Sequence, residues 1–223
     1  MAKKAAPSNK ADGRPGKAEA KRVVAPPPAD AAVLQRRIGR LEAKLKAAQA
    51  QIAALGARAD TDFLLDILNR RGFERAIIRA IAYLRRYPAS AAIVYLDVDG
   101  LKPVNDRFGH AAGDALLKAI VQLLTEQVRL SDVVARLGGD EFGLLLWNLS
   151  ERDAAAKARA LEKAVAALTV AHRGHVISAG ISAGVTMLNE ADVPDAAIGR
   201  ADAAMYLQKR SRKSRKRVRP IRR

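Results

Sequence analysis

The clearest pattern of apolar positions lies near the start of the chain, where apolar residues recur at alternating intervals of four and three. The seam that they form consists of Leu34, Ile38, Leu41, Leu45, Ala48, Ile52 and Leu55. With Ile38, Leu45 and Ile52 at heptad position a, the other four occupy position d, and Arg, Lys, Glu and Gln fill much of the remaining surface. This repeat predicts a coiled-coil helix over 31–58 that pairs two copies of the chain. The alternative is a single amphipathic helix packed against its own domain.

After this helix, the apolar pattern predicts a mixed domain of helices and strands. Helical spacing covers 63–87, 115–128 and 153–168, and a last helix is predicted to begin near Pro194. Continuous or alternating apolar residues predict strands over 91–98, 132–137, 141–147 and 177–187, and the segment 99–114 is expected to be irregular. From residue 91 this order is that of the split βαβ plan. The predicted class is therefore α+β and ferredoxin-like, with an antiparallel-containing sheet and helices on one face.

Net charge changes this picture only at the two ends of the chain. The 223 residues carry a formal net charge of +17. Residues 1–30 hold seven Lys and Arg against three acidic residues, and 209–223 hold ten against none, which leaves +3 for 31–208. Blocks of like charge are typical of solvated ends, so we predict a disordered basic arm over 1–30 and a basic tail over 211–223. Aromatic residues are 4% of the chain and do not interleave with the basic ones, so we expect no specific nucleic-acid binding.

The composition also bears on the compartment. The chain has no cysteine, which excludes disulfides and thiolate metal sites and favours a reducing environment. The longest strongly apolar stretch, 91–96, is far shorter than the roughly 20 residues that a membrane-spanning helix needs. The first residues contain no apolar signal core. We therefore expect a cytoplasmic protein without a transmembrane segment.

Candidate chemistry gathers at the ends of the predicted strands. Asp97 and Asp99 close the first strand, and Asp140 and Glu141 lie in the predicted hairpin between the next two. Carboxylates that converge on one spot repel one another unless a cation holds them. Because neither Cys nor His joins the cluster, the hard oxygen donors favour magnesium. The preceding Gly138-Gly139 pair would let the turn adopt positive φ and let a ligand approach the backbone, although a plain hairpin turn is the alternative for this pair alone.

Two long motifs resemble those of a known family. The segment Arg136-Leu137-Gly138-Gly139-Asp140-Glu141-Phe142 resembles the signature of the GGDEF-domain diguanylate cyclases, and 97–114, Asp-Val-Asp-Gly-Leu-Lys-Pro-Val-Asn-Asp-Arg-Phe-Gly-His-Ala-Ala-Gly-Asp, resembles the second block of that family. The resemblance covers about 61–213. It implies a sheet of the nucleotidyl cyclase or palm type and a catalytic domain over 59–210.

The resemblance also implies a mechanism and its residues. Two GTP molecules, one on each of two facing domains of a homodimer, would be joined into cyclic di-GMP with release of two pyrophosphates, in a signal-transduction role. Mg²⁺, or Mn²⁺ in its place, would be held by Asp97, Asp140 and the main-chain carbonyl of Val98, and Glu141 would support the metal or accept the proton of the 3′-hydroxyl. The remaining implied substrate residues are Asn105 and Asp114 for the guanine edge, Lys102 and Lys209 for the phosphates, and Gly138 and Gly139 against the nucleotide.

A shorter match concerns regulation. Arg129-Leu130-Ser131-Asp132 ends five residues before Gly138, which resembles the RxxD inhibitory product site of the family; a surface ion pair is the alternative. The chain departs from the family at the entry segment 64–70, at Gly100-Leu101 where Phe-Phe is common, and at Lys213 where an arginine is usual. These departures leave a second interpretation, a catalytically weak receptor for GTP or cyclic di-GMP.

Overall fold

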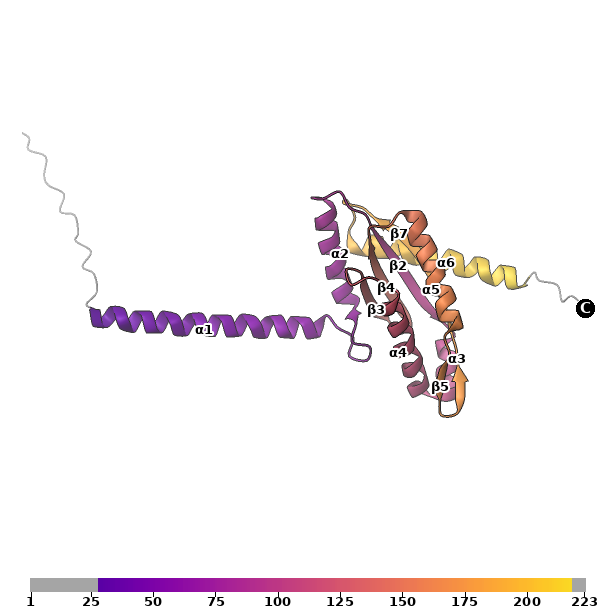
Figure 1. The fold of residues 1–223 in the computed structure, drawn as a ribbon, viewed down its shortest axis with the longest axis horizontal. Helices are drawn as coiled ribbons and strands as arrows, with labels where there is room; N and C mark the ends of the chain where they lie inside the picture. The colour runs from indigo at the N-terminus through magenta and orange to yellow at the C-terminus, as the bar shows by residue number, and fades with distance from the viewer. Residues whose placement is uncertain (1–27, 218–223) are drawn as a thin grey trace, which may run out of the picture. The chain divides into compact units, whose positions relative to one another are not determined.

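The N-terminal part of the described chain is one continuous helix. A computed structural model describes residues 28–217, with side chains for 31–49, 51 and 59–211. Helix α1 (Pro28–Ala59) is 32 residues long and contains the predicted seam (Figure 1). The seam side chains Leu34, Ile38, Leu41 and Leu45 are 50%, 53%, 57% and 60% exposed. The helix agrees with the prediction, whereas its pairing with a second copy stays a prediction. Side chains are not described for Ile52, Leu55, the basic arm or most of the basic tail, but the backbone of 211–217 in the tail is helical.

The second unit is built on a five-stranded sheet with the order β1-β3-β4-β2-β7. Strand β1 (Leu68–Asn69) runs parallel to β3 (Val133–Gly138), and every other neighbouring pair is antiparallel. Strand β2 (Ala91–Asp99) lies between β4 (Glu141–Trp147) and β7 (Gly180–Leu188). The predicted α+β class with an antiparallel-containing sheet is confirmed.

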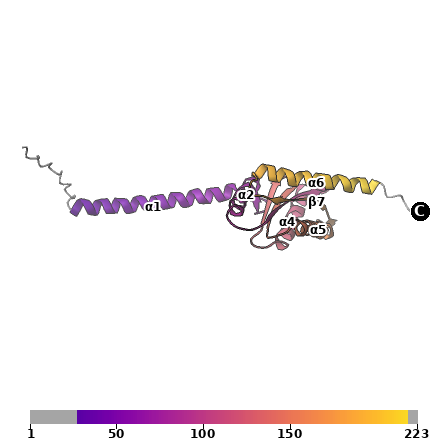
Figure 2. The same cartoon turned by 90° about the horizontal axis from the view of Figure 1, so that it is seen from above.

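Helices cover both faces of this sheet, so the prediction of helices on one face was wrong. Helices α2 (Arg70–Leu84) and α6 (Pro194–Arg217) pack on one face, and α4 (His110–Glu126) and α5 (Glu151–Ala167) on the other (Figure 2). The side chains of β2 divide accordingly: Ile93 and Tyr95 join the α2/α6 core, and Val94 and Leu96 join the α4/α5 core. A strand buried on both faces is apolar at consecutive positions rather than at alternate ones. The run 91–96 carries that signal.

The predicted helix over 63–87 begins later, at Arg70. Before it, the Asp62 carboxylate accepts hydrogen bonds from the N–H groups of Leu64 and Leu65, both at 3.0 Å, which fixes a turn instead. The side chain of Asn69 then caps α2 by accepting a hydrogen bond from Gly72 N at 3.0 Å. Because side-chain acceptors satisfy main-chain donors here, the chain gains a defined corner at the entry to the domain.

Two other predicted segments also differ from the structure. The segment 99–114, expected to be irregular, contains the short helix α3 (Leu101–Phe108) and the start of α4. The strand predicted over 177–187 begins at Gly180. A small separate hairpin precedes it, formed by β5 (Val170–His172) and β6 (His175–Ile177). Across 28–217, no helix is both long enough and apolar enough to cross a lipid bilayer.

Candidate active site

The end of β2 and the β3–β4 hairpin bring the predicted carboxylates together. Asp97 lies directly opposite Glu141 in the register of β2 and β4. The main-chain N–H of Val98 donates a hydrogen bond of 2.9 Å to the carbonyl of Asp140. Residues more than 40 positions apart in the sequence therefore meet at one edge of the sheet, as their positions at a strand end and in a hairpin predicted.

At Gly138 and Gly139, the hairpin requires the absence of a side chain and not a positive φ angle. The positive φ expected for this pair is not observed. A Cβ atom at Gly138 would lie 2.8 Å from Oε2 of Glu141, so glycine leaves room for that carboxylate. A Cβ atom at Gly139 would meet nothing within 4 Å, so its backbone is open to a ligand.

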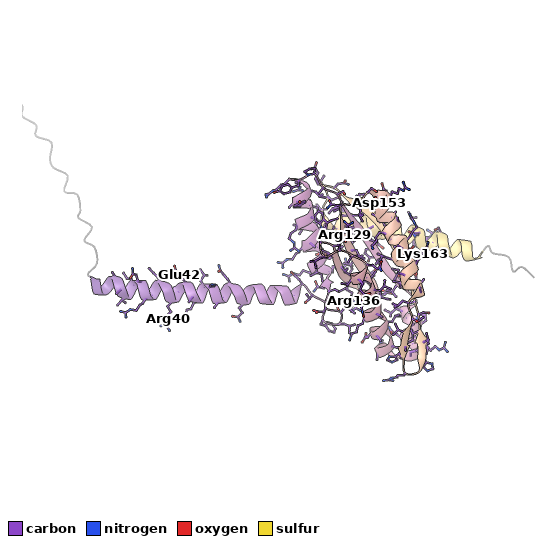
Figure 3. All side chains as sticks on the ribbon, viewed as in Figure 1. Arg40, Glu42, Arg129, Arg136, Asp153 and Lys163 are labelled. Atoms are coloured by element: carbon purple, nitrogen blue, oxygen red, sulfur yellow. The ribbon has the colours of Figure 1, made fainter. Side chains whose placement is uncertain are left out.

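Two arginines fasten the hairpin to the entry segment. Arg136 donates hydrogen bonds of 3.1 and 2.7 Å to the carbonyl of Gly139 and pairs with Asp62 at 3.3 Å. Arg70 donates a hydrogen bond of 2.9 Å to the carbonyl of Leu137, and its Nη2 lies 3.8 Å from Oε2 of Glu141. Figure 3 labels Arg136 in the domain. Sequence analysis missed the roles of Arg70 and Asp62, because both act through contacts with a hairpin that is far away in the sequence.

Lys209 of α6 provides the positive charge next to the carboxylates. Its ammonium group bonds Asp97 and lies 3.2 Å from Oδ1 of Asp99, and Ser182 donates a hydrogen bond of 2.8 Å to the other oxygen of Asp99. Burial raises the pKa of Asp97, with the charges of Asp140 and Asp99 adding to the effect and Lys209 opposing it. Burial would lower the pKa of Lys209, but its bonds to Asp97 and Asp99 outweigh burial and raise it. Because these carboxylates repel one another, a bound cation would stabilise the cluster.

The donors present fit a hard divalent cation that shares its shell with a ligand. The charge of Asp140 raises the pKa of Asp97, and the main-chain carbonyl of Val98 belongs to the same strand end. Within the described side chains, no three His, Cys, Asp or Glu residues converge closely enough to hold an ion by themselves. Mg²⁺ commonly takes one or two carboxylates and completes its shell with water and substrate phosphates, which this arrangement allows.

A pocket of about 330 Å³ adjoins these carboxylates. Its lining combines α3 with the hairpin: Leu101, Lys102, Asn105, Asp106, His110, Gly139 and Asp140. Oδ1 of Asn105 is buried and has no hydrogen-bond partner among the described residues. A Cβ atom at Gly113 would lie 1.9 Å from that oxygen, so glycine is required for Asn105 to lie where it does. Asp114, predicted alongside Asn105, follows on α4 and is half-buried, but it is not one of the lining residues.

Arg129 and Asp132 of the predicted product site line a second pocket, of about 360 Å³. It lies between α5 and the loop before β3, and Figure 3 labels two of its lining residues, Arg129 and Asp153. The other lining residues are Gln127, Asp132, Leu146, Trp147, Leu149, Ala156, Lys157 and Ala160. The Asp132 carboxylate accepts hydrogen bonds from the N–H groups of Arg129 and Trp147, at 2.9 and 3.0 Å. The Asp132 side chain therefore fixes the loop by bonding main-chain N–H groups, while the Arg129 side chain is exposed.

Comparisons with known proteins identify the family of this chain. Residues 59–215 match the family described as diguanylate cyclase, GGDEF domain. The diguanylate cyclase TpbB of Pseudomonas aeruginosa is 36% identical over 174 residues, which are 76% of this chain; the chain spans 40% of that relative. The solved GGDEF domain of TpbB is 38% identical with a TM-score of 0.64, and the match covers 68% of this chain and 89% of that domain.

A further solved structure concerns the interaction of a microbial GGDEF domain with cyclic di-GMP. That domain is 34% identical with a TM-score of 0.60, and the match covers 69% of this chain and 94% of that one. The family match, the sequence identity and the shared fold all fall on the part of the chain that carries the carboxylate cluster. The chain belongs to the family of diguanylate cyclase GGDEF domains.

Proposed function

We propose that this chain is a diguanylate cyclase that condenses two GTP molecules into cyclic di-GMP and releases two pyrophosphates. The observation that carries the proposal is the carboxylate cluster in which Asp97 faces Glu141 next to Asp140, beside a pocket with an unpaired buried acceptor. A divalent metal bound by carboxylates and phosphates is the usual equipment for transferring a nucleotidyl group.

The pocket supports recognition of a guanine base. Oδ1 of Asn105 is a buried acceptor, and a buried acceptor without a donor costs about 1–3 kcal/mol. Guanine offers N–H donors at its edge, and an amide can also donate to its acceptors. Asn105 would thus gain its missing hydrogen bond from the base, and Asp114 on the neighbouring helix would accept a second N–H.

The phosphates would lie between the hairpin and two lysines. Lys102 lines the pocket, and Lys209 already lies at the carboxylates. The open backbone at Gly139 allows a phosphate to approach the main chain, and Gly138 leaves room beside it for the Glu141 carboxylate. Lysine suits this task because it acts as a point charge that needs no fixed geometry.

The residues of this chain would then align and neutralise the reactants. Mg²⁺, with Mn²⁺ as an alternative, would be held by Asp97, Asp140 and the carbonyl of Val98, and would stabilise charge on the phosphates. The 3′-oxygen of one nucleotide bonds to the α-phosphorus of the other, the bond to the β-phosphate breaks, and pyrophosphate leaves. Glu141 supports the metal or accepts the proton of the hydroxyl. Catalysis of this kind comes mainly from positioning and charge neutralisation.

Because each domain would bind one GTP, the reaction needs two copies facing each other. The exposed seam of α1 offers a means of pairing them: a parallel coiled coil places both domains at the same end. Charges beside the seam agree with a parallel pair. Arg37 at position g and Glu42 at position e are five residues apart, the spacing at which g and e positions of two parallel helices meet.

The pocket beside α5 supports feedback by the product. Arg129 and Lys157 are cationic residues in its lining, and Arg129 is exposed and able to bond a phosphate or a guanine edge with its fork of donors. We assign Arg129 to binding the product and Asp132 to shaping the loop that presents it.

The proposed activity is tested by incubating the purified chain with GTP and Mg²⁺ and separating the products by chromatography. Formation of cyclic di-GMP with two pyrophosphates for each product molecule would support the proposal. Binding of GTP or cyclic di-GMP without any turnover would favour the receptor interpretation. If the chain shows neither turnover nor binding, both the cyclase and the receptor interpretation are wrong.

A further inference from the structure

Glu162 of α5 is a buried carboxylate outside the candidate active site. It is 7% exposed, and among the described residues only Glu162 and Ser182 are polar or charged and buried. The other buried side chains of α5, such as Leu161 and Val165, are apolar. Because a buried charge is costly unless it is hydrogen-bonded, the partners of Glu162 indicate what it does.

The first partner is the edge strand of the sheet. In the described part of the chain, β7 pairs with β2 on one side, and its other side faces no further strand. The main-chain N–H of Ala183 on β7 donates a hydrogen bond of 3.0 Å to Oε1 of Glu162. A side chain of α5 thus satisfies a main-chain donor of the edge strand and covers this part of the sheet edge.

The second partner is Gln208 on α6. Its Nε2 donates a hydrogen bond of 3.3 Å to the same oxygen of Glu162. Helices α5 and α6 cover opposite faces of the sheet, and both pack against β7 (Figure 2). The Glu162 carboxylate therefore joins α5, β7 and α6 at the edge of the sheet.

The bond to Gln208 lies just beyond the point where the apolar anchoring of α6 ends. Met205 is the last buried residue among the described side chains of this helix, and a Cβ atom at Gly184 of β7 would lie 2.1 Å from its main-chain nitrogen. In the next residues, 206–211, only Gln208 and Lys209 are not exposed. Polar contacts of these two side chains therefore attach this part of the helix to the domain.

Lys209 needs such an attachment because its own partners would change in the proposed reaction. Its ammonium group bonds Asp97 and lies 3.2 Å from Oδ1 of Asp99. If Asp97 binds a metal ion, its carboxylate is shared and the ammonium group becomes available to the phosphates. The bond between Gln208 and Glu162 does not involve these carboxylates, so it would keep this turn of α6 in place during the exchange.

We propose that Glu162 and Gln208 are positioning residues, which fix the end of α6 and thereby hold Lys209 within reach of the substrate phosphates. The inference rests on the proposed cyclase activity, and it assigns neither residue a contact with the substrate. In a purely structural role, the same bond would stabilise the edge of the domain without a specific effect on Lys209.

Gln208→Leu tests this bond because it removes the donor and approximately keeps the size of the side chain. It leaves the bond between Glu162 and Ala183 in place, so the domain is expected to fold. Gln208→Lys restores a donor that is long enough to reach Glu162. Gln122→Leu is the matched control, since Gln122 of α4 is exposed and donates a similar bond of 3.0 Å to Glu126 within its own helix.

Calorimetric titration with 3′-deoxy-GTP and Mg²⁺ measures binding without turnover, because this analogue lacks the attacking hydroxyl. Gln208→Leu should weaken binding by about fivefold or more, and Gln208→Lys should restore most of the affinity. Gln122→Leu should bind like wild type. In a Lys209→Met background, Gln208→Leu should have no further effect, because the cation that it positions is absent.

The inference is overturned if Gln208→Leu binds the analogue as tightly as wild type, or if Gln208→Lys restores none of the affinity. It is also overturned if the loss persists undiminished in the Lys209→Met background, because the bond would then act independently of Lys209. A wild-type chain that does not bind the analogue contradicts both this inference and the proposed function. A wild-type chain that binds it but forms no cyclic di-GMP from GTP contradicts the proposed function alone, and the same affinities still decide the role of Gln208.

Discussion

Asp97 and Glu141 lie directly opposite each other on the antiparallel strands β2 and β4. Like charges at opposed positions destabilise a sheet, so this pairing has a cost that the fold must offset. Lys209 offsets part of it by bonding Asp97. The register that opposes the two carboxylates is fixed by burial on both faces of β2, because a slip of one residue would exchange every side chain between the two cores.

The position of Asn105 should depend on the absence of a side chain at residue 113. In Gly113→Ala, the new Cβ would meet Oδ1 of Asn105 at 1.9 Å and displace the amide from the pocket. We expect GTP affinity to fall about tenfold or more, as in Asn105→Ala, because the same hydrogen bond is lost. Calorimetric titration with GTP measures this.

Gly199→Ala is the matched control for that substitution. Gly199 is also in a helix, and a Cβ atom there would meet nothing within 4 Å. Alanine at such a site should stabilise the domain by about 0.4–1 kcal/mol and leave GTP binding unchanged. Equal GTP affinity in Gly113→Ala and wild type would show that Asn105 does not contact the base.

The central strand and its hairpin could be predicted from the sequence because their signals are local. The apolar run 91–96 and the Gly138-Gly139 turn define β2 and the β3–β4 hairpin. The short helix α3 escaped prediction because only Leu101 and Val104 are buried in its eight residues. Likewise, β5 and β6 have three residues each, too few to show a period.

The parts of the site that were missed depend on contacts between distant segments. Arg70 reaches the hairpin across 67 positions, and Ser182 reaches Asp99 across 83. Tyr95 lies between Gly143 and Gly184 because of the register of β2 with β4 and β7, which the apolar strand alone does not show. Such relationships follow from strand pairing and helix packing, which no local pattern encodes.

Arg129 and Asp132 should respond differently to substitution. Arg129→Ala removes an exposed side chain and is expected to relieve inhibition by added cyclic di-GMP while leaving uninhibited activity and stability near wild type. Asp132→Ala removes the acceptor of two main-chain hydrogen bonds and should also lower the free energy of unfolding by about 1–2 kcal/mol. Initial rates across cyclic di-GMP concentrations and thermal melts measure both. If the wild-type chain shows no inhibition, the Arg129 assignment is wrong.

Pairing through α1 predicts that activity follows dimer formation. Lysine at both Leu41 and Leu45 would place like charges in the seam, so the dimer and the activity should fall together. Lysine at both Ala43 and Ala47 is the control, because these outer positions of the heptad receive the same added charge. Figure 3 shows Arg40 and Glu42 on this helix, where charged side chains are already accommodated. Sedimentation analysis and initial rates across protein concentration give the result; a fully active monomer would contradict this role.

The Asp192–Arg200 pair predicts a stability difference that depends on pH. Two contacts of 2.9 and 2.7 Å join Asp192, in the loop between β7 and α6, to Arg200 of α6. The hydrogen bond from Arg200 lowers the pKa of Asp192, although burial opposes it. Because the folded pKa lies below the unfolded one, the stabilisation is present above the ordinary value of 3.8 and is lost as the pH falls through the folded value.

At pH 7, Asp192→Asn should therefore have a lower melting temperature than wild type. Its free energy of unfolding should be lower by about 1 kcal/mol. The difference should shrink as the pH falls below 3.8, the ordinary pKa of aspartate. Thermal melts followed by circular dichroism across this pH range provide the comparison. Glu190→Gln removes an exposed carboxylate from the same loop and should show no such change. A constant difference at every pH would contradict the ion pair as its source.

The central claim is that the chain converts GTP to cyclic di-GMP and needs the carboxylate cluster at the hairpin to do so. Asp140→Asn tests this claim most directly. This change keeps the shape of the side chain and removes the charge that would hold the metal. The measurement is the initial rate of cyclic di-GMP formation from GTP and Mg²⁺, compared for wild type and Asp140→Asn at a protein concentration where both are dimers. We predict that the wild type forms cyclic di-GMP and that the variant is slower by on the order of 10³-fold or more, with an unchanged melting temperature. Near-normal production by Asp140→Asn would contradict the account.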